Sequence, residues 1–397
     1  MLIVEFRDRH ASKKRVENRI GSFVEASNMA GFPIFSSRRV RCTPFTSRIE
    51  AAGLTSYTVY NHMLLPTSFS SLEEDYSHLK KHVQIWDVAG QRQVEVSGPD
   101  AHELMLKLCA RDISKAKTGR CYYTPITDAQ GGMLNDPIVL RIDHDRYWIS
   151  ISDSDLALWA AGVAEGLGMN VEVREPDVSP LAIQGPKSND VMAEVFGENI
   201  RSLKFFHYAH FDWRGHKLLI ARSGFSKQGG FEVYLHDSKL GPMLWDDIWE
   251  IGRDFEMRVG CPNLIERVEG GLLSYGNDMT RDDTPLECGL SKYVSLHADH
   301  DFIGKAALKA QNEKNLRKEL MGVKISGTPI EPAKNPLSCR TNGRNAGMVT
   351  SACFSPDFDT NIGIAMLGNG ITSSGTQVDV LVGNEWRTAR TTALPFS

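Results

Sequence analysis

The chain has 397 residues, a hydrophobic fraction of 41% and a formal net charge of −4. This length exceeds what one hydrophobic core usually supports, so two or three domains are expected. The mild negative charge argues against nucleic acid or an anionic membrane as a partner. No apolar run reaches the roughly 18 residues of a membrane helix, and the first 20 residues lack a signal-peptide core.

The first half of the chain is predicted to fold as an N-terminal extension and an α+β domain. Residues 1–35 are polar and irregular, and residues 36–178 form the predicted domain. A serine before an acidic first turn and two lysines at the end predict a helix over 71–83. The other expected elements are an extended segment 55–66, strands 84–89 and 91–98, a helix 99–110, a hairpin 121–143 turning at Gln130-Gly131-Gly132, a strand 145–153 and a helix 154–168.

A similar order of strands and helices recurs after residue 178. The expected elements are a strand-rich segment 172–186, a helix 188–197, paired strands 207–235 and a helix 239–255. The recurrence predicts two related α+β halves, the second over 179–323, instead of a parallel Rossmann sheet. Short strands separated by Gly, Pro and Asn turns, with Asn342-Gly343 and Gly368-Asn369-Gly370 as the strongest turn signals, predict a small C-terminal β domain over 324–397.

The hairpin over residues 222–234 has the most informative local pattern. Strand alternation places Glu232 and Tyr234 on one face and Phe231 and Val233 on the other. An inward carboxylate beside an aromatic ring suits a flat, nitrogen-rich heterocycle such as a pterin. The alternative is an ordinary hairpin with a surface glutamate. The glycine pairs at 229–230 and 270–271 do not join a strand to a helix as a phosphate-binding fingerprint requires.

The cysteines and histidines do not predict a metal site. The seven cysteines are widely spaced and odd in number, with no C-x-x-C pair. They are expected to be free thiols in a reducing cytosol, which predicts a cytoplasmic protein. His207 and His210 lie three residues apart, but their aromatic surroundings offer no third ligand.

Five segments together resemble the aminomethyltransferase, or glycine-cleavage T-protein, superfamily of folate-dependent enzymes. They are GGMLNDPIVL (131–140), LAIQGP (181–186), GFSKQGGFE (224–232), RVEGGLLSYGNDM (267–279) and VTSACFSP (349–356). Within that superfamily, long stretches such as GCPNLIERVEGGLLSYGND are similar to the dimethylsulfoniopropionate demethylases. The resemblance implies a T-protein-like ring of three domains with tetrahydrofolate in a central hole.

The resemblance also implies folate-binding residues. Glu232 matches the glutamate that hydrogen-bonds the pterin, Tyr123 matches a tyrosine lining the folate cavity, and Gln184 lies in a matching segment. Asp136 occupies the second place of the family's acidic pair and is the expected catalytic residue, while Asn135 departs from the pair. Asn263 replaces an arginine of the T-proteins, which leaves the folate-tail contacts undetermined.

The donor pocket is expected to be aromatic, because a sulfonium cation binds aromatic faces. The candidates are Phe225, Tyr234, Trp148 and also Tyr123, with core packing as the alternative for each. Phe225 stands where the related demethylases have tryptophan. Ser150 shares a strand face with Trp148 and is a further candidate for binding substrate. Lys227 is a candidate partner for the donor's carboxylate, although it flanks a turn.

The resemblance implies methyl transfer from the sulfonium of dimethylsulfoniopropionate to N5 of tetrahydrofolate, which gives 5-methyltetrahydrofolate and 3-(methylthio)propionate. The alternatives are an aryl methyl ether O-demethylase and a T-protein-like aminomethyltransferase. A non-catalytic folate protein of iron–sulfur assembly would carry K-G-C-Y-x-G-Q, where this chain has YGNDMTRDDTPLECG. A homodimer is possible, and no metal, nucleic acid or membrane is expected to bind.

Overall fold

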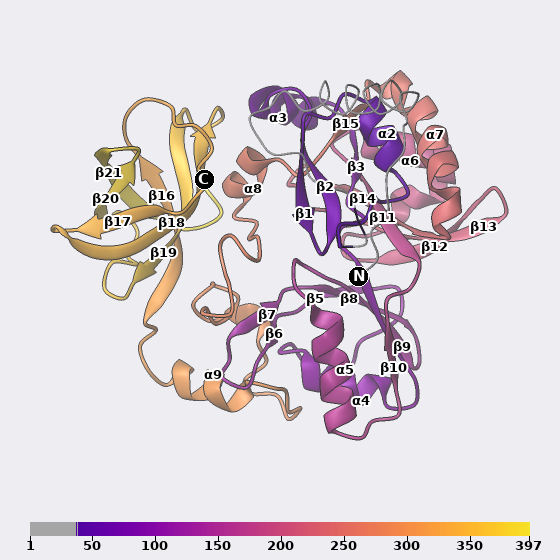
Figure 1. Ribbon diagram of the computed structural model, residues 1–397, viewed down its shortest axis with the longest axis horizontal. Coiled ribbons are helices and arrows are strands. Elements are labelled where there is room, and N and C mark those ends of the chain that lie inside the picture. Colours follow the sequence, from indigo (N-terminus) through magenta and orange to yellow (C-terminus); the bar gives the residue numbers. More distant parts are fainter. Residues whose placement is uncertain (1–36, 38) are drawn as a thin grey trace, which may run out of the picture. The chain divides into compact units, whose positions relative to one another are not determined.

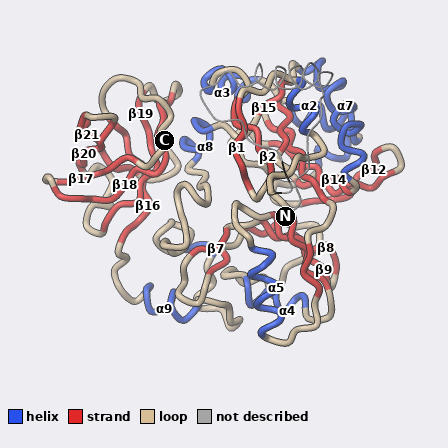
Figure 2. The backbone as a smooth tube through the Cα atoms, in the orientation of Figure 1, coloured by secondary structure: helices blue, strands red, loops and turns tan. Residues whose placement is uncertain are grey.

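The computed structural model describes residue 37 and residues 39–397, so the predicted extension over 1–35 lies outside the described residues. Contacts divide the chain into Met1–Arg41 and Cys42–Ser397, and the second unit carries every element considered below. Helices and strands alternate along it (Figures 1 and 2), and its last part is a closed barrel. This confirms the α+β class and the C-terminal β domain.

The first large sheet has five strands in the order β10-β4-β9-β8-β5. Its strands are β4 (Gln93–Ser97), β5 (Cys121–Tyr123), β8 (Ile138–Asp143), β9 (Arg146–Ser150) and β10 (Glu172–Arg174). Helices α4 (Ala101–Leu108) and α5 (Leu156–Gly166) pack on one face through a buried apolar cluster that includes Val94, Val96, Tyr147 and Ile149. Trp148 belongs to a different cluster, which includes residues of the second sheet. The alternating residues of β4 and β9 therefore serve two packing surfaces.

The second sheet has six strands in the order β12-β13-β14-β11-β3-β15. They are β3 (Gln84–Asp87), β11 (Val178–Gln184), β12 (Tyr208–Trp213), β13 (His216–Ala221), β14 (Gly230–His236) and β15 (Arg258–Gly260). A buried cluster joins one face to helices α2 (Thr46–Ala51), α6 (Ser188–Phe196) and α7 (Gly241–Gly252). Strand β3 comes from the first half of the chain but pairs with β11 and β15. The predicted domain boundaries remain predictions.

Two hairpins and a capped helix lie beside these sheets. The sequence predicts one extended segment over 55–66, but the structure has β1 (Ser56–Tyr60) and β2 (Met63–Ser68) in an antiparallel hairpin. The chain reverses because Asn61 and His62 both have positive φ, 50° and 62°, as in the tight turns that suit hairpins. The predicted turn at 130–132 joins β6 (Ile126–Thr127) to β7 (Met133–Asn135). Helix α3 (Leu72–Lys81) has the predicted Ser71 cap, which accepts from Glu74 N at 3.1 Å.

The C-terminal strands close into a barrel in the order β16-β19-β18-β17-β20-β21 (Figure 1). They are β16 (Lys318–Ile325), β17 (Leu337–Thr341), β18 (Arg344–Ser355), β19 (Thr360–Gly368), β20 (Gln377–Val382) and β21 (Glu385–Thr392). The predicted Asn342-Gly343 turn connects β17 and β18, with φ of 49° and 75°. Helix α8 (Leu264–Gly270), a long connection and helix α9 (Lys305–Asn312) precede the barrel. Neither helix was predicted from the sequence. Within the described residues, no helix is long and apolar enough to cross a membrane.

Candidate folate and methyl-donor site

The predicted division of β14 into two faces is present in the structure. Phe231 and Val233 belong to the buried cluster beneath the helices. Tyr234 packs instead in the cluster that includes Trp148 and Cys121 of the other sheet. Glu232 shares the face of Tyr234 because strand side chains alternate. The carboxylate therefore points away from the helix-covered core.

Glu232 is a buried carboxylate that receives few hydrogen bonds from the protein. The residue is 6% exposed, and from the described part of the chain only the Ser223 hydroxyl donates to it. Burial raises the pKa of Glu232, and the hydrogen bond from Ser223 acts in the opposite direction. A buried carboxylate needs further donors. Glu232 can therefore accept N–H groups of a ligand, as the pterin hypothesis requires.

Asp136 follows directly after β7 and receives two hydroxyl donors. Tyr123 Oη donates to Oδ2 at 2.9 Å, and Ser152 Oγ donates to Oδ1 at 2.5 Å. Burial raises the pKa of Asp136 to about 6, although both hydrogen bonds favour the ionised form. The carboxylate therefore changes charge within two pH units of neutrality, as acid–base residues often do.

Asn135 has a structural role beside this carboxylate. Its Nδ2 donates to the Ser152 carbonyl at 2.9 Å and to Ser154 Oγ at 2.8 Å, and its Oδ1 accepts from Ser152 N at 3.0 Å. The amide thereby fixes the segment after β9 that carries the Ser152 hydroxyl. The departure from the family's acidic pair leaves Asp136 as the ionisable member.

Tyr123 connects the two acids through β5. Its hydroxyl binds Asp136, and its ring meets Tyr293 edge-to-face with centroids 4.7 Å apart. Cys121 lies two residues earlier on the same strand face, about 7 Å away by strand geometry. Burial raises the pKa of Cys121, and the charge of Glu232 adds to this shift. Strand β5 therefore has Asp136 at one end and Glu232 near the other.

Gln184 lies beneath the loop between β13 and β14. Its Nε2 donates to the Ser223 carbonyl at 3.1 Å, and its Oε1 accepts from Ser226 Oγ at 2.8 Å. Gly224 and Gly230 allow this close approach, because a Cβ would lie 2.1 Å and 2.5 Å from Gln184 Nε2. The amide therefore holds the loop that carries Ser223. Its contact with folate stays a prediction.

The predicted donor residues lie in two places. Trp148 and Tyr234 pack together between the sheets with ring centroids 6.2 Å apart, and both are buried. The Trp148 Nε1 group donates to Glu95 at 2.8 Å, and Ser150 Oγ accepts from Gln93 at 2.9 Å. Phe225 is half-buried on the loop above Gln184. The contacts of Trp148 agree with core packing, which was its alternative interpretation.

Lys227 and Asn263 both make contacts with α8. The stem of Lys227 crosses Gly270, where an added Cβ would lie 2.9 Å from Lys227 Cδ. The hydrogen bond from Lys80 lowers the pKa of Asp357, and the charge of Lys227 adds a smaller effect in the same direction. Asn263 is the N-cap of α8 and accepts from Ile265 N at 3.0 Å and Glu266 N at 3.3 Å. Asn263 therefore stabilises a helix at the position where the T-proteins have arginine.

Several residues around Asp136 were not predicted. Burial raises the pKa of Tyr60 and of Tyr275, and the negative charge of Asp136 adds to both shifts. Tyr60 ends β1 and Tyr275 lies in the connection before the barrel, so no local pattern joins them. The contact of Ser223 with Glu232 could have been predicted from the hairpin. Ala221 pairs with Glu232, and Ser223 lies two residues further along the same hairpin.

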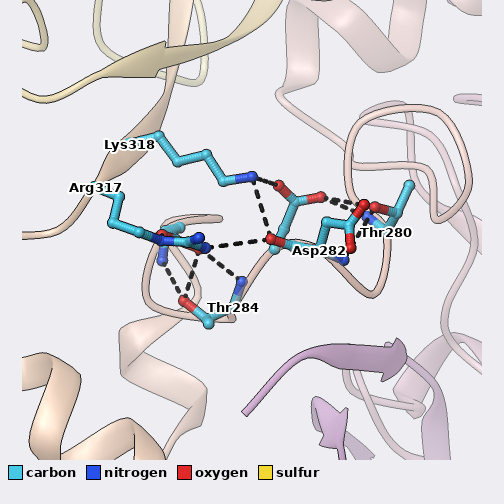
Figure 3. Close-up of polar contacts among 7 residues, drawn as sticks. Thr280, Asp282, Thr284, Arg317 and Lys318 are labelled. Atoms are coloured by element: carbon cyan, nitrogen blue, oxygen red, sulfur yellow. Dashed lines mark hydrogen bonds and ion pairs between the residues drawn. The ribbon is translucent and has the colours of Figure 1, made fainter. Parts of the chain in front are cut away.

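An ionic network supports the connection that carries Tyr275 (Figure 3). Lys318 Nζ donates to Asp283 at 2.5 Å and to the Asp282 carbonyl at 3.2 Å, at the start of β16. Arg317 Nε donates to Glu287 at 3.0 Å. The Asp283 carbonyl accepts from Met133 N at 2.9 Å. This network therefore joins the barrel to β7, whose end positions Asp136.

A separate cavity of about 470 Å³ contains none of the predicted site residues. It is lined by His210, His216, Lys217, Leu218 and His236. Within the part of the chain that the structure describes, no group of three His, Cys, Asp or Glu side chains could hold a metal ion. The absence of a metal requirement stays a prediction.

Comparison with known proteins identifies the family. The GCVT N-terminal domain matches residues 45–298, and the glycine cleavage T-protein C-terminal barrel domain matches residues 318–397. The chain is 50% identical over 347 residues to dimethylsulfoniopropionate demethylase DmdA of Ruegeria pomeroyi, covering 87% of this chain and 94% of that protein. It is 30% identical to an aminomethyltransferase of Anoxybacillus flavithermus, covering 84% and 92% of the two chains. The crystal structure of the glycine cleavage system aminomethyltransferase T of Bartonella henselae has a TM-score of 0.81 at 23% identity, covering 90% and 98%. The T-protein-like fold is thus confirmed, and the chain belongs to the glycine cleavage T-protein family.

Proposed function

We propose that the protein is a tetrahydrofolate-dependent demethylase that takes a methyl group from dimethylsulfoniopropionate. The products are 5-methyltetrahydrofolate and 3-(methylthio)propionate. The observation that carries this proposal is the identity to the Ruegeria demethylase, which is well above that to the aminomethyltransferase over a similar share of the chain. The arrangement around Asp136 and Asn135 supports it independently.

The proposed reaction is an in-line displacement at the methyl carbon. The N5 lone pair of tetrahydrofolate forms the new N–C bond, while the C–S bond breaks and its electron pair stays on sulfur. The leaving group is a neutral thioether and needs no general acid. The positive charge moves from sulfur to N5, which then loses its proton. The protein therefore contributes orientation, exclusion of water and stabilisation of the moving charge.

Asp136 suits both electrostatic demands of this reaction. With a pKa of about 6 it is mostly ionised at neutral pH. Its negative charge stabilises the cation as the charge moves to N5, and it can accept the proton that N5 releases. Asn135 supplies no second acid at this point, because a carboxamide does not titrate, and its amide is hydrogen-bonded to Ser152 and Ser154. An aryl ether leaves as a phenolate and would benefit from such an acid.

Glu232 supplies the proposed recognition of the pterin. Its buried carboxylate can accept paired N–H donors from the ring. Tyr123 is half-buried beside Asp136 and provides aromatic surface for the folate and the methyl donor, whereas Tyr234 is buried against Trp148 on the strand that carries Glu232. Binding of tetrahydrofolate and of a sulfonium donor would thus use separate ends of one site.

The deciding experiment measures methyl transfer to tetrahydrofolate from matched donors. The donors are dimethylsulfoniopropionate, an aryl methyl ether of similar size and a methylated glycine, and 5-methyltetrahydrofolate is quantified by mass spectrometry. We expect transfer from the sulfonium and at least tenfold less from the others. A reaction without tetrahydrofolate is the control. Faster transfer from the ether, or release of a 5,10-methylene product from an aminomethyl donor, would refute the proposal.

The expected cellular context follows from the cysteines. All seven are free in the structure, and six of them are buried. Unpaired cysteines are typical of proteins in a reducing compartment, which supports the proposal of a cytoplasmic location. The possible homodimer remains an expectation.

A further inference from the structure

The glycine-rich loop between β13 and β14 is held at its base by Gln184, as described above. This contact fixes Ser223, whose hydroxyl donates to Glu232. The far end of the loop extends beyond Phe225 and includes Lys227 and Gln228. Gln184 also accepts from Ser226 Oγ at 2.8 Å, so its support reaches the residue after Phe225 but not Lys227 or Gln228.

The far end of the loop is held by Glu266 of helix α8. Glu266 is 1% exposed, and its Oε1 accepts from Lys227 N at 2.8 Å and from Gln228 Nε2 at 3.0 Å. Gly270 lies one helical turn later and lets the Lys227 stem cross the same helix. Residues four apart share a helix face, so α8 presents one face to the loop.

Residues next to Glu266 in sequence fix the other faces of α8 to the barrel side. Arg267 pairs with Asp278 at 2.6 Å and donates to Ser351 Oγ of β18 at 2.5 Å. Ile265 and Val268 pack against apolar residues of the barrel strands. Glu266 therefore projects from a helix that an ion pair, a hydrogen bond and apolar packing attach to the barrel side, and its two hydrogen bonds attach the loop to that helix.

We propose that Glu266 is a positioning residue that fixes the loop so that Phe225 is presented to the methyl donor. This proposal rests on the proposed function, because it assigns Phe225 to the donor pocket. Gln184 and Glu266 contact different residues of the loop, so the proposal predicts different effects on the methyl donor and on folate. Gln184 contacts Ser223, which orders the Glu232 carboxylate for folate, and Ser226, whereas Glu266 contacts only loop residues that follow Phe225. Loss of Glu266 should therefore affect the donor more than folate.

The first test measures the order of the loop without any substrate. Lys227 is exposed and offers a trypsin site within the loop. Glu266→Ala removes the acceptor of both hydrogen bonds, and we expect cleavage after Lys227 to accelerate roughly tenfold or more. Glu266→Gln keeps an acceptor oxygen and should stay close to wild type, and Gln228→Ala should have an intermediate effect. The matched control is Glu194→Ala, which removes an exposed glutamate from α6.

The second test measures donor kinetics and folate binding in the same variants. For Glu266→Ala we expect the KM for dimethylsulfoniopropionate to rise roughly tenfold, while the dissociation constant for tetrahydrofolate stays within about twofold of wild type. Glu266→Gln should recover most of the donor KM. A general loss of stability would instead lower the amount of active enzyme and leave both constants unchanged.

The outcomes separate this proposal from the proposed function. If wild type is active and Glu266→Ala has wild-type cleavage and donor KM, Glu266 does not position the loop. If the variant opens the loop but folate binding weakens as much as donor binding, the division of the loop is wrong. If wild type transfers no methyl group from the sulfonium, the proposed function fails, and equal cleavage of wild type and Glu266→Ala would overturn the contact with the loop as well.

Discussion

Replacing Asp136 by asparagine should raise the stability of the ligand-free protein, relative to wild type, as the pH increases. Burial raises the pKa of Asp136 from 3.8 to about 6. Between these two values the folded protein holds a proton that the unfolded chain has released. Wild-type stability therefore falls as the pH rises through this window and is level above it. Asparagine does not titrate, so the variant does not lose stability at this position as the pH rises.

The magnitude follows from the size of the pKa shift. A rise from 3.8 to about 6 corresponds to about 3 kcal/mol at about 1.4 kcal/mol per unit. About 2 kcal/mol of this develops between pH 4.5 and pH 8. Asparagine can accept only one of the two hydroxyl donors from Tyr123 and Ser152 with its oxygen. That mismatch costs about 1–3 kcal/mol, but equally at every pH.

The assay is urea unfolding of wild type and Asp136→Asn at pH 4.5 and pH 8. We expect the free energy of unfolding of the variant, relative to wild type, to increase by about 2 kcal/mol from the lower to the higher pH. Asp87 has a pKa that burial also raises to about 6, but it is present in both proteins, so its contribution cancels. A difference between the two proteins that does not change with pH would show that Asp136 is not a buried ionised group. In the proposed reaction, the rise of kcat/KM through about pH 6 should also disappear in the variant.

The other predictions concern the predicted ligands and the absence of a metal. Glu232→Gln should weaken tetrahydrofolate binding by about 1.5–3 kcal/mol without unfolding the protein, as measured by titration, because a charge-assisted bond is lost; an unchanged affinity would remove Glu232 from the pterin site. Phe225→Ala should lower use of dimethylsulfoniopropionate by about 0.5–2 kcal/mol in kcat/KM, whereas Phe225→Trp should keep or improve it; equal kinetics for both variants would exclude a ring contact with the sulfonium. Treatment with a chelator should leave turnover unchanged. Loss of turnover would contradict a displacement mechanism that uses protein residues such as Asp136 and no metal ion.

Local patterns in the sequence were sufficient for much of the fold. Alternation along 230–236 correctly separated Glu232 and Tyr234 from the buried Phe231 and Val233. The Ser71 cap and the Asn342-Gly343 turn were also correct, because caps and tight turns depend on a few neighbouring residues. The resemblance of several segments to one superfamily identified the family that the domain models confirm.

Tertiary structure decided which distant residues meet. Ser223 and Glu232 are hairpin neighbours, but the partners of Asp136 come from β5 and from the segment after β9. The hairpin at Asn61 was missed because a short polar pair between apolar residues does not by itself show that φ is positive. The function of Glu266 as a support for the loop depends on α8 and β14 being adjacent in space. The sequence thus determined side-chain chemistry and local conformation, whereas long-range packing determined which carboxylates became buried and what they contact, because burial and hydrogen-bond partners arise only when the sheets, α8 and the barrel come together.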